Sequence, residues 1–429
     1  MDRKLGRDFG KLWAAASVSG LGDGVTQIAG PLLAVSITRS PAQVAGLMVA
    51  QQLSWTLFAL LSGAMVDRVD RRLAMVSASG IRAAALAALA VMVFTGHADM
   101  PLLYVIFFAV GCAGLVFDNA ATAVLPALVP RSGLERANGR LQSAVTLARS
   151  LVAQPLGAWL FALAAWVPFL LDASGLVLVA ALAVALPALV NAAPAHRSRP
   201  TLRASMREGA HWLAGHRLLR TLAVTVAVSN VGLGAVFAVF VLVARVRLGV
   251  GPLGYGLLLA ASALGGIAGG LLADRVVRAI GAGWVLRVEM IVEIFTYLGL
   301  ALTRSAVVAG GLLALLGMHL VMFSTVTASL RQSLAPANML GRVYGAYRTA
   351  SNGGMLAGAV LGGLLSSYFG LTAPFLLGFT AMTTVTASVW GSLGNRDIRA
   401  ARQLALADGG ATRLSRDSSP AGRSVPSGG

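Results

Sequence analysis

The sequence carries little charge for its length. Only 12% of its 429 residues are Asp, Glu, Lys or Arg, whereas a typical soluble domain has about 25%. Stretches of about 20 residues consequently lack a polar face, and that length is enough to cross the hydrocarbon core of a bilayer. The scarcity of charge excludes a soluble multidomain protein and predicts an all-α polytopic membrane protein.

Cysteine and nucleotide-binding motifs are also scarce. The one cysteine, Cys112, lies in an apolar run, which excludes an intramolecular disulfide and a cysteine metal cluster. The sequence has no G-x-x-x-x-G-K-[ST] loop and no soluble segment large enough for a nucleotide-hydrolysing domain. It also has no nucleophile and base set of the kind that enzymes use. We therefore expect no enzymatic activity, no metal site and no cofactor.

What the sequence does contain is a series of long apolar segments. Windows of about 19 residues predict twelve transmembrane helices, at 10–38, 44–66, 74–95, 101–130, 140–164, 166–190, 220–244, 254–274, 283–303, 307–332, 341–366 and 372–393.

A polar segment separates the first six of these spans from the last six. From Leu202 onward its apolar residues recur at helical spacing, which predicts an amphipathic helix on the inner leaflet. The end of the chain is rich in Ser, Pro and Gly and is predicted to be disordered. The predicted organisation is an N-terminal half at 1–190, a cytoplasmic linker at 191–219, a C-terminal half at 220–395 and a tail at 396–429.

The formal net charge of +18 is distributed unevenly along the chain. If the N-terminus is inside, most arginines fall in cytoplasmic segments, as the positive-inside rule requires. This pattern predicts a multi-pass protein of the plasma membrane with both termini cytoplasmic and with basic loops that contact anionic lipid headgroups. Topology thus accounts for the basic residues, and we expect no nucleic-acid partner.

The two sets of spans repeat each other. FDNAATAVLPALVP at 117–130 aligns with FSTVTASLRQSLAP at 323–336 at an offset of 206 residues, and a charged motif recurs at an offset of 207. Two parallel six-helix repeats are a layout of secondary transporters, with the substrate path between the halves. The paired positions of the charged motif are Gly63 with Gly270, Asp67 with Asp274, and Arg68 with Arg275.

These motifs resemble the major facilitator superfamily. GAMVDRVDRR at 63–72 is similar to the loop signature Gly-x-x-x-Asp-Arg-x-Gly-Arg-Arg, with Asp70 where the commoner form has glycine. The segments around the first span, the fourth span and the linker resemble the efflux-type branch, which includes drug and siderophore exporters. The antiporter motif Gly-Pro-x-x-Gly-Gly is degenerate here, because Gln154 and Ala158 replace two of its glycines. The resemblance covers about residues 10–393 and implies the major facilitator fold.

The resemblance also implies that the charged motif is a conformational latch that favours an outward-open state. Asp67, after the second span, would reach the positive N-terminal end of the eleventh span near 340–342. Asp274 would correspondingly reach the start of the fifth span near 136–140. Positive-inside charges explain some of the arginines but not two acids in register. The candidate latch residues are Gly63, Asp67, Arg68, Arg71, Gly270, Asp274 and Arg275.

Charged residues within spans are expensive in a membrane and are candidates for substrate binding or proton coupling. Asp23 and Gln27 share one face of the first span. Asp118 and Arg149 both fall in the cytoplasmic half of their spans and could pair, either as a proton-linked site or as a structural salt bridge. Further candidates are Arg348 and Asn352, which face together early in the eleventh span and could line the cavity.

Three ionisable residues of the C-terminal half receive structural interpretations. Glu289 and Glu293 share a helix face, and we expect them to pair with Arg287 at an interface or lipid edge, with titration of both as the alternative. His319 is interpreted as a hydrogen-bonded imidazole, with a proton relay as the alternative.

The row Gly354, Gly358 and Gly362 is predicted to be a small-residue packing stripe.

The hypothesis that follows is a monomeric secondary active transporter that exports a small amphipathic or lipophilic compound by alternating access. A proton gradient would supply the energy. The alternatives are an importer or facilitator of a small metabolite with the same fold, and a membrane sensor that does not transport.

Overall fold

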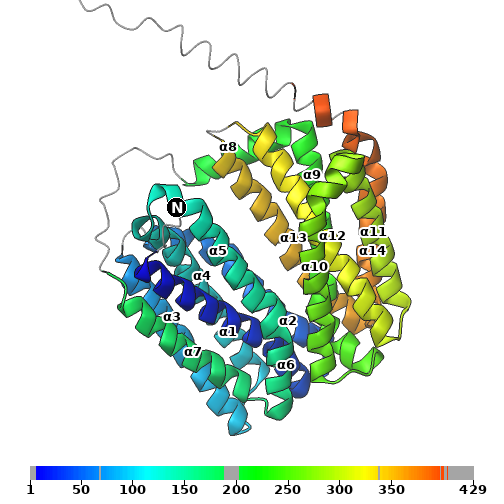
Figure 1. Cartoon of the computed structure of the whole chain (residues 1–429). Helices are drawn as coiled ribbons and strands as arrows, with labels where there is room; N and C mark the ends of the chain where they lie inside the picture. The colour runs from blue at the N-terminus through cyan, green and yellow to red at the C-terminus, as the bar shows by residue number, and fades with distance from the viewer. Residues whose placement is uncertain are drawn as a thin grey trace, which may run out of the picture.

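The computed structural model describes residues 6–66, 69–187, 202–336, 339–396, 398–400 and 403. These residues form helices and no strand (Figure 1). The α-helices are α1 Arg7–Ile37, α2 Pro41–Val66, α3 Arg71–Phe94, α4 Met100–Leu128, α5 Leu134–Thr146, α6 Ala153–Leu163, α7 Val167–Val184, α8 Leu202–Gly215, α9 Arg217–Leu242, α10 Pro252–Ile280, α11 Ala282–Leu302, α12 Ala306–Leu334, α13 Leu340–Phe369 and α14 Ala373–Val389. Short helical segments complete the chain: 3₁₀-helices η1 Arg131–Gly133 and η4 Trp390–Leu393, and π-helices η2 Leu147–Val152 and η3 Val243–Arg247.

Seven helical segments of the described part are long and apolar enough to cross a membrane. They are α3, α4, α7, α9 with η3, α10, α12, and α14 with η4. The other predicted spans correspond to α1, α2, α5 to α6, α11 and α13. The fold is that of an all-α polytopic membrane protein. Of the predicted linker, residues 191–201 lie outside the described residues, as does the predicted tail beyond residue 403.

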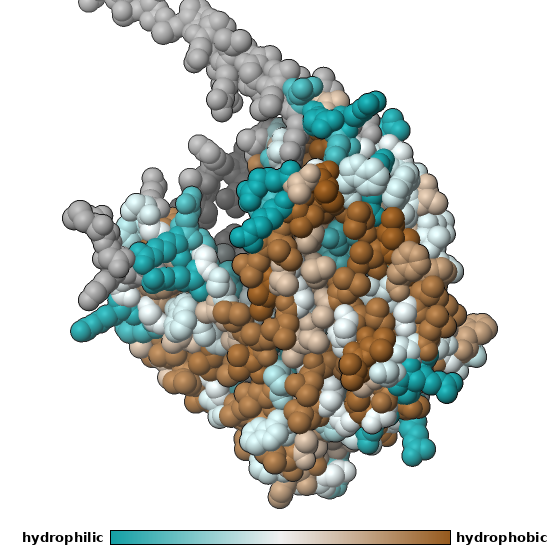
Figure 2. Space-filling view, turned by 45° about the vertical axis from the view of Figure 1, so that its right-hand side comes forward, coloured by the Kyte–Doolittle hydropathy of each residue, from teal (hydrophilic) through white to brown (hydrophobic). Residues whose placement is uncertain are grey.

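The helices lie in two groups, with α1 to α7 on one side and α9 to α14 on the other (Figure 1). Apolar side chains cover the middle of the face drawn in Figure 2, and hydrophilic ones gather toward its ends. Many large apolar side chains are exposed, including Val307 at 85% and Phe295 at 63%. A belt of this kind is what a bilayer covers, since soluble monomers rarely expose large apolar patches.

Glycines allow helices to pack closely within each group. Cβ atoms at Gly354, Gly358 and Gly362 of α13 would collide with carbonyl oxygens of α9. The predicted packing stripe is therefore confirmed. In the other group, a Cβ at Gly157 of α6 would lie 2.9 Å from Val25 Cα on α1. In each group, these glycines allow the first span and the fifth span to pack closely together.

The departure from the loop signature at Asp70 has a structural reason. Its carboxylate caps α3 by accepting a hydrogen bond of 2.8 Å from the backbone N–H of Arg72. A glycine cannot make this bond, and an acid also suits the positive end of a helix. Arg71 then ties α3 to α4, because its guanidinium donates to the carbonyl oxygen of Ala123 at 2.9 Å.

Removing the cap should have a small, measurable cost. Asp70→Ala should lower the free energy of unfolding by about 1 kcal/mol, seen as a lower thermal midpoint of the purified protein in detergent. Asp70→Asn keeps a side-chain acceptor and serves as the control, with a nearly unchanged midpoint. Equal losses in both variants would contradict the capping role.

The two groups touch at the end remote from α8. There, the backbone N–H of Ala42 in α2 donates to Ser367 Oγ of α13 at 3.2 Å, and a Cβ at Gly363 would lie 2.6 Å from Ala45 Cβ. At the end that carries α8, Figure 2 shows the surface hollowed between the groups, with hydrophilic side chains beside the hollow. The structure is closed at one end and open at the other.

α8 forms where the amphipathic helix was predicted, and it packs against the first turn of α13. Its Glu208 forms an ion pair with Arg342. A Cβ at Gly209 would collide with the Arg342 backbone. One face of the helix is therefore covered by protein.

Candidate functional site

Charged side chains, one of them fully buried, join three spans of the N-terminal group. Arg82 of α3 is 1% exposed, and its guanidinium forms an ion pair with Asp23 of α1 and donates to Ser19 Oγ at 3.1 Å. The guanidinium of Arg149 lies 3.6 Å from the second carboxylate oxygen of Asp23. We call Asp23, Arg82 and Arg149 the N-terminal charge network. One carboxylate thus lies between two guanidinium groups.

Arg149 occupies the π-helix η2 in the middle of the fifth span. π-Helical turns within α-helices are rare and often occur at functional sites. α1 approaches this turn closely, since a Cβ at Gly24 would collide with the carbonyl oxygen of Arg149. The irregular turn and the glycine together bring the guanidinium of Arg149 to Asp23.

The pairing expected between Asp118 and Arg149 is not formed. Among the described residues, the carboxylate within ion-pair distance of Arg149 is that of Asp23, on α1 rather than on α4. Asp118 is instead exposed, and it interacts electrostatically with Arg149 and, across the two groups, with Arg348 of α13. Asp118 therefore lies within electrostatic range of charges of both groups. Gln27, one turn beyond Asp23 on α1, is exposed as well.

Asp172 of α7 is a further acid near the network that the sequence analysis did not single out. It is 2% exposed and accepts a hydrogen bond of 2.6 Å from Thr26 Oγ1 of α1. It also interacts electrostatically with Arg82. A Cβ at Gly22 would collide with its carboxylate, so glycine at 22 makes room for the acid.

Arg348 lies at the seam between the two groups. Its guanidinium is 5.2 Å from the centre of the Trp55 ring on α2 and donates to Tyr344 Oη at 3.3 Å. Asn352, one turn further, is partly buried, and the neighbouring Ser351 accepts a hydrogen bond of 3.0 Å from Asn230 of α9. The predicted pair on α13 therefore lies where α2 and α9 approach.

The expected pairing of Glu289 and Glu293 with Arg287 is wrong. Arg287 donates to the carbonyl oxygen of Trp390 at 3.0 Å. Both glutamates face His319 of α12 instead, at 2.9 Å and 3.1 Å. α11 presents both glutamates to α12 and Arg287 to η4, so Arg287 lies on a different face of the helix from the two glutamates. His319 is hydrogen-bonded, as the structural interpretation required.

The predicted latch contact of Asp274 is not made in this structure. Its side chain is 88% exposed and forms an ion pair of 3.1 Å with Arg278 on its own helix. Arg342, near the expected partner of Asp67, pairs with Glu208. The physical reason is that the two groups are separated at this end. Asp67 and Arg68 lie outside the described residues, and the latch role stays a prediction for all seven residues: Gly63, Asp67, Arg68, Arg71, Gly270, Asp274 and Arg275.

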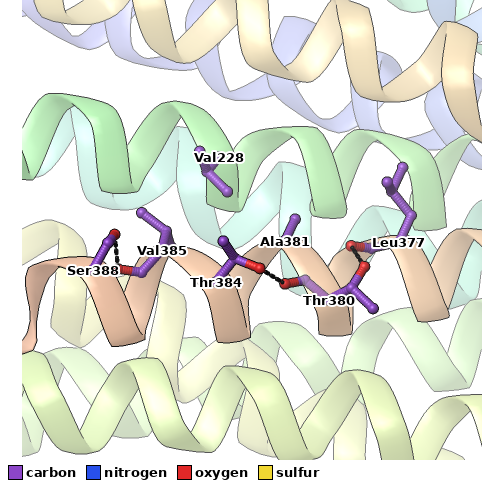
Figure 3. A pocket seen from close by; sticks show the side chains of 7 residues that line it. All are labelled: Val228, Leu377, Thr380, Ala381, Thr384, Val385 and Ser388. Carbon is purple, nitrogen blue, oxygen red and sulfur yellow. Dashed lines mark hydrogen bonds between the residues drawn. The ribbon is translucent and has the colours of Figure 1, made fainter.

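A groove of about 480 Å³ between α9 and α14 is not a polar site. In Figure 3, Val228 of α9 faces a row of α14 side chains that includes Thr380 and Thr384. Thr384 Oγ1 donates to the carbonyl oxygen of Thr380 at 2.8 Å, and Thr380 Oγ1 to that of Leu376 at 2.9 Å. Because these hydroxyls are bonded to their own helix, the groove presents mainly methyl groups.

Arg82 and Asp172 are the residues that sequence reasoning missed. Each is a single ionisable residue within a strongly apolar predicted span, at 74–95 and 166–190. The rule that intramembrane charges are functional candidates applies to both, so the signal was present. The sequence does not indicate which residues these two side chains contact, because the partners are distant in the chain. Arg82 and Asp23, for example, are 59 residues apart.

Comparison with known proteins identifies relatives of the chain. A protein family described as transmembrane secretion effector, in the major facilitator group, matches residues 6–400. An uncharacterized MFS-type transporter of Mycobacterium bovis is 33% identical over 162 residues, and so is one of Mycobacterium tuberculosis. Each alignment covers 37% of this chain and 35% of the relative, so the chain aligns with about a third of the length of these curated relatives.

Solved structures of transporters share the fold. A bacterial homologue of the iron transporter ferroportin in an inward-facing state has a TM-score of 0.75 at 17% identity, covering 91% of this chain and 100% of that one. The nucleoside transporter NupG has a TM-score of 0.72 at 11% identity, covering 90% and 99%. A bacterial homologue of the lysosomal transporter Spinster, inward-facing and unoccupied, has a TM-score of 0.67 at 14% identity, covering 94% and 97%.

Proposed function

Since the chain belongs to the transmembrane secretion effector family of the major facilitator superfamily, and is therefore a multi-pass membrane transporter, we propose that it exports a small amphipathic compound in exchange for protons. The family description supports the direction. The closed end and the hollowed end of the structure support alternating access, because a transporter of this kind opens its central path to one side at a time.

The proposal of proton coupling rests on Asp118. It is an exposed carboxylate within a span, and it interacts electrostatically with Asp23 and Arg149 of its own group and with Arg348 of the other. An acid in such a place can alternate between a proton and an arginine. When Asp118 is protonated, its attraction to both guanidinium groups is lost, and the charge balance between the halves changes.

The groups beside Asp118 favour an amphipathic substrate. Trp55 offers an aromatic face and Arg348 a guanidinium that lies 5.2 Å from the centre of that ring. An aromatic face binds apolar or cationic groups, and Arg binds anionic ones. Gln27 and Asn352 add hydrogen-bonding groups on α1 and α13. A solute with an apolar body and one polar or charged end would use this set.

The proposed orientation follows from the basic segments. We place both termini in the cytoplasm and the protein in the plasma membrane, with its basic loops on anionic headgroups, as a monomer whose hollow faces the cytoplasm. No cofactor is proposed, and the proton gradient supplies the energy. Import by the same cycle is the alternative, and the direction of flux decides between the two.

The test is flux in inverted membrane vesicles with an imposed proton gradient and a panel of amphipathic dyes. Wild type should accumulate at least one dye when the vesicle interior is acidic. Asp118→Asn should lose the dependence on the gradient, while it still exchanges dye between the two sides of the membrane. Asp8→Asn, which changes an exposed carboxylate paired with Lys11, is the control and should behave as wild type. Flux of every dye that ignores the gradient would refute proton coupling.

A further inference from the structure

The C-terminal group contains a buried cluster of three titratable side chains that the proposed transport cycle does not use. His319 of α12 lies between Glu289 and Glu293 of α11, with Nδ1 at 2.9 Å from Glu289 Oε2 and Nε2 at 3.1 Å from Glu293 Oε2. The side chains are 2%, 7% and 2% exposed, respectively. We call Glu289, His319 and Glu293 the C-terminal triad.

Hydrogen-bond counting fixes the minimum number of protons in the triad. Each of the two N···O contacts needs one hydrogen, but a neutral imidazole has only one N–H. Either His319 is an imidazolium that donates to both carboxylates, or one glutamate is protonated and donates to the bare nitrogen. The two arrangements contain the same protons, so the net charge of the triad is −1 in both.

The remaining oxygens of the two glutamates differ. Glu293 Oε1 accepts hydrogen bonds from Ser229 Oγ at 2.6 Å and from Tyr297 Oη at 3.1 Å. Glu293 is therefore surrounded by donors and holds the negative charge. For Glu289 Oε1, by contrast, the described residues supply no hydrogen bond. This oxygen is the position in the triad that is free to take a proton.

Among the described residues, no arginine or lysine forms an ion pair with the triad. Arg287 of α11 donates instead to the carbonyl oxygen of Trp390, and Arg331 lies in the last turn of α12. α14 has no ionisable residue, and the charged residues of α10, Asp274, Arg275 and Arg278, lie in its last turns. α9 contributes Ser229, and α11 itself adds Tyr297. A buried charge without a counter-charge is costly in a low-dielectric surrounding. One more proton would make the triad neutral.

We propose that the C-terminal triad is a buried proton-binding site that takes up one proton from solvent at Glu289 Oε1. In the loaded form Glu289 is a carboxylic acid, His319 an imidazolium and Glu293 a carboxylate. The proton comes from a hydronium ion in solvent: one of its O–H bonds breaks and releases water, and one O–H bond forms on Glu289. This site lies in the C-terminal half of the protein. It is separate from the N-terminal charge network and from Asp118, which both lie in the N-terminal half.

The triad is connected to the central path through α9. Ser229 donates to Glu293 on one face of the helix, and the next residue, Asn230, donates to Ser351 of α13 on another. A change in the hydrogen bonds of Glu293 would therefore act on the helix that α13 packs against. That the bound proton is coupled to substrate movement rests on the proposed function. Proton binding itself does not.

The experiment uses infrared difference spectroscopy of the full chain in lipid nanodiscs, comparing pH 8 with pH 5 without substrate. The chain has only four glutamates, Glu135, Glu208, Glu289 and Glu293, while the intramembrane acids of the N-terminal group, Asp23, Asp118 and Asp172, are all aspartates. Labelling with ¹³C-glutamate or with ¹³C-aspartate therefore distinguishes Glu289 and Glu293 from these three aspartates in the unmodified protein. The expected result is a buried carboxylic acid C=O band at low pH that shifts with labelled glutamate.

Variants assign the band to one residue. Glu289→Gln should abolish the glutamate band, and Glu135→Gln, at the exposed start of α5, should leave it unchanged. A band that shifts only with labelled aspartate, or no acid band at all, would overturn the proposal even if Glu289→Gln does not fold. Proton-driven dye flux with no glutamate band would leave the transport function standing and remove the triad from it.

Discussion

Arg82→Gln should lower the free energy of unfolding by about 3–5 kcal/mol, which is the typical cost of removing one partner of a buried ion pair. The arginine is 1% exposed and faces Asp23 directly. Without it, Asp23 retains only the more exposed Arg149 at 3.6 Å, and the buried Asp172 loses its strongest nearby cation. The measurement is thermal unfolding of the purified protein in detergent, together with the yield of folded protein.

Two further variants separate charge from packing. Asp23→Asn combined with Arg82→Gln removes both charges of the pair, and it should recover a large part of the lost stability. Arg278→Gln breaks an exposed ion pair, in which Arg278 is 70% and Asp274 88% exposed, and should change little because such pairs contribute about 0.5 kcal/mol or less. If Arg82→Gln behaves like Arg278→Gln, the N-terminal charge network is not a stabilising feature.

A side chain at Gly363 should force the closed end of the molecule open. A Cβ there would lie 2.6 Å from Ala45 Cβ and 3.2 Å from Ala42 Cα, both on α2. Gly363→Leu therefore overpacks the seam, at a cost of about 1–3 kcal/mol. At about 1.4 kcal/mol per factor of ten, this shifts the population away from the present conformation by about five- to a hundredfold.

The shift is measurable as a distance between two spin labels at the closed end. Arg39→Cys and Tyr368→Cys, both exposed, supply the labels in a Cys112→Ser background. The Gly363→Leu variant should add a longer-distance population. Gly353→Leu is the matched control on the same helix, because a Cβ at Gly353 meets nothing within 4 Å. Identical distance distributions for both variants would show that the α2–α13 contact does not hold this end closed.

The sequence alone determined the class of protein, the positions of the long helices and the family. These features are local: an apolar run of about 20 residues spans a bilayer whatever its neighbours are, and a glycine row such as Gly354, Gly358 and Gly362 marks a packing face wherever its partner lies. The repeated motif of Asp67 and Asp274 likewise needs only alignment. Arg82 and Asp172 could also have been singled out from the sequence as candidate site residues, because each is an ionisable residue in an apolar span.

Only the tertiary structure decided which charges meet. Asp23 and Arg149 pair, although Asp118 and Arg149 were expected to, and Glu289 faces His319 rather than Arg287. Which neighbour a side chain reaches depends on the rotation of its helix and on helices brought together from distant parts of the chain. His319 and Glu289 are 30 residues apart, and Arg82 and Asp23 are 59 apart. The surroundings of Asp274, a predicted latch residue, were decided in the same way, because the separation of the two halves leaves its side chain 88% exposed, and no residue encodes that separation by itself.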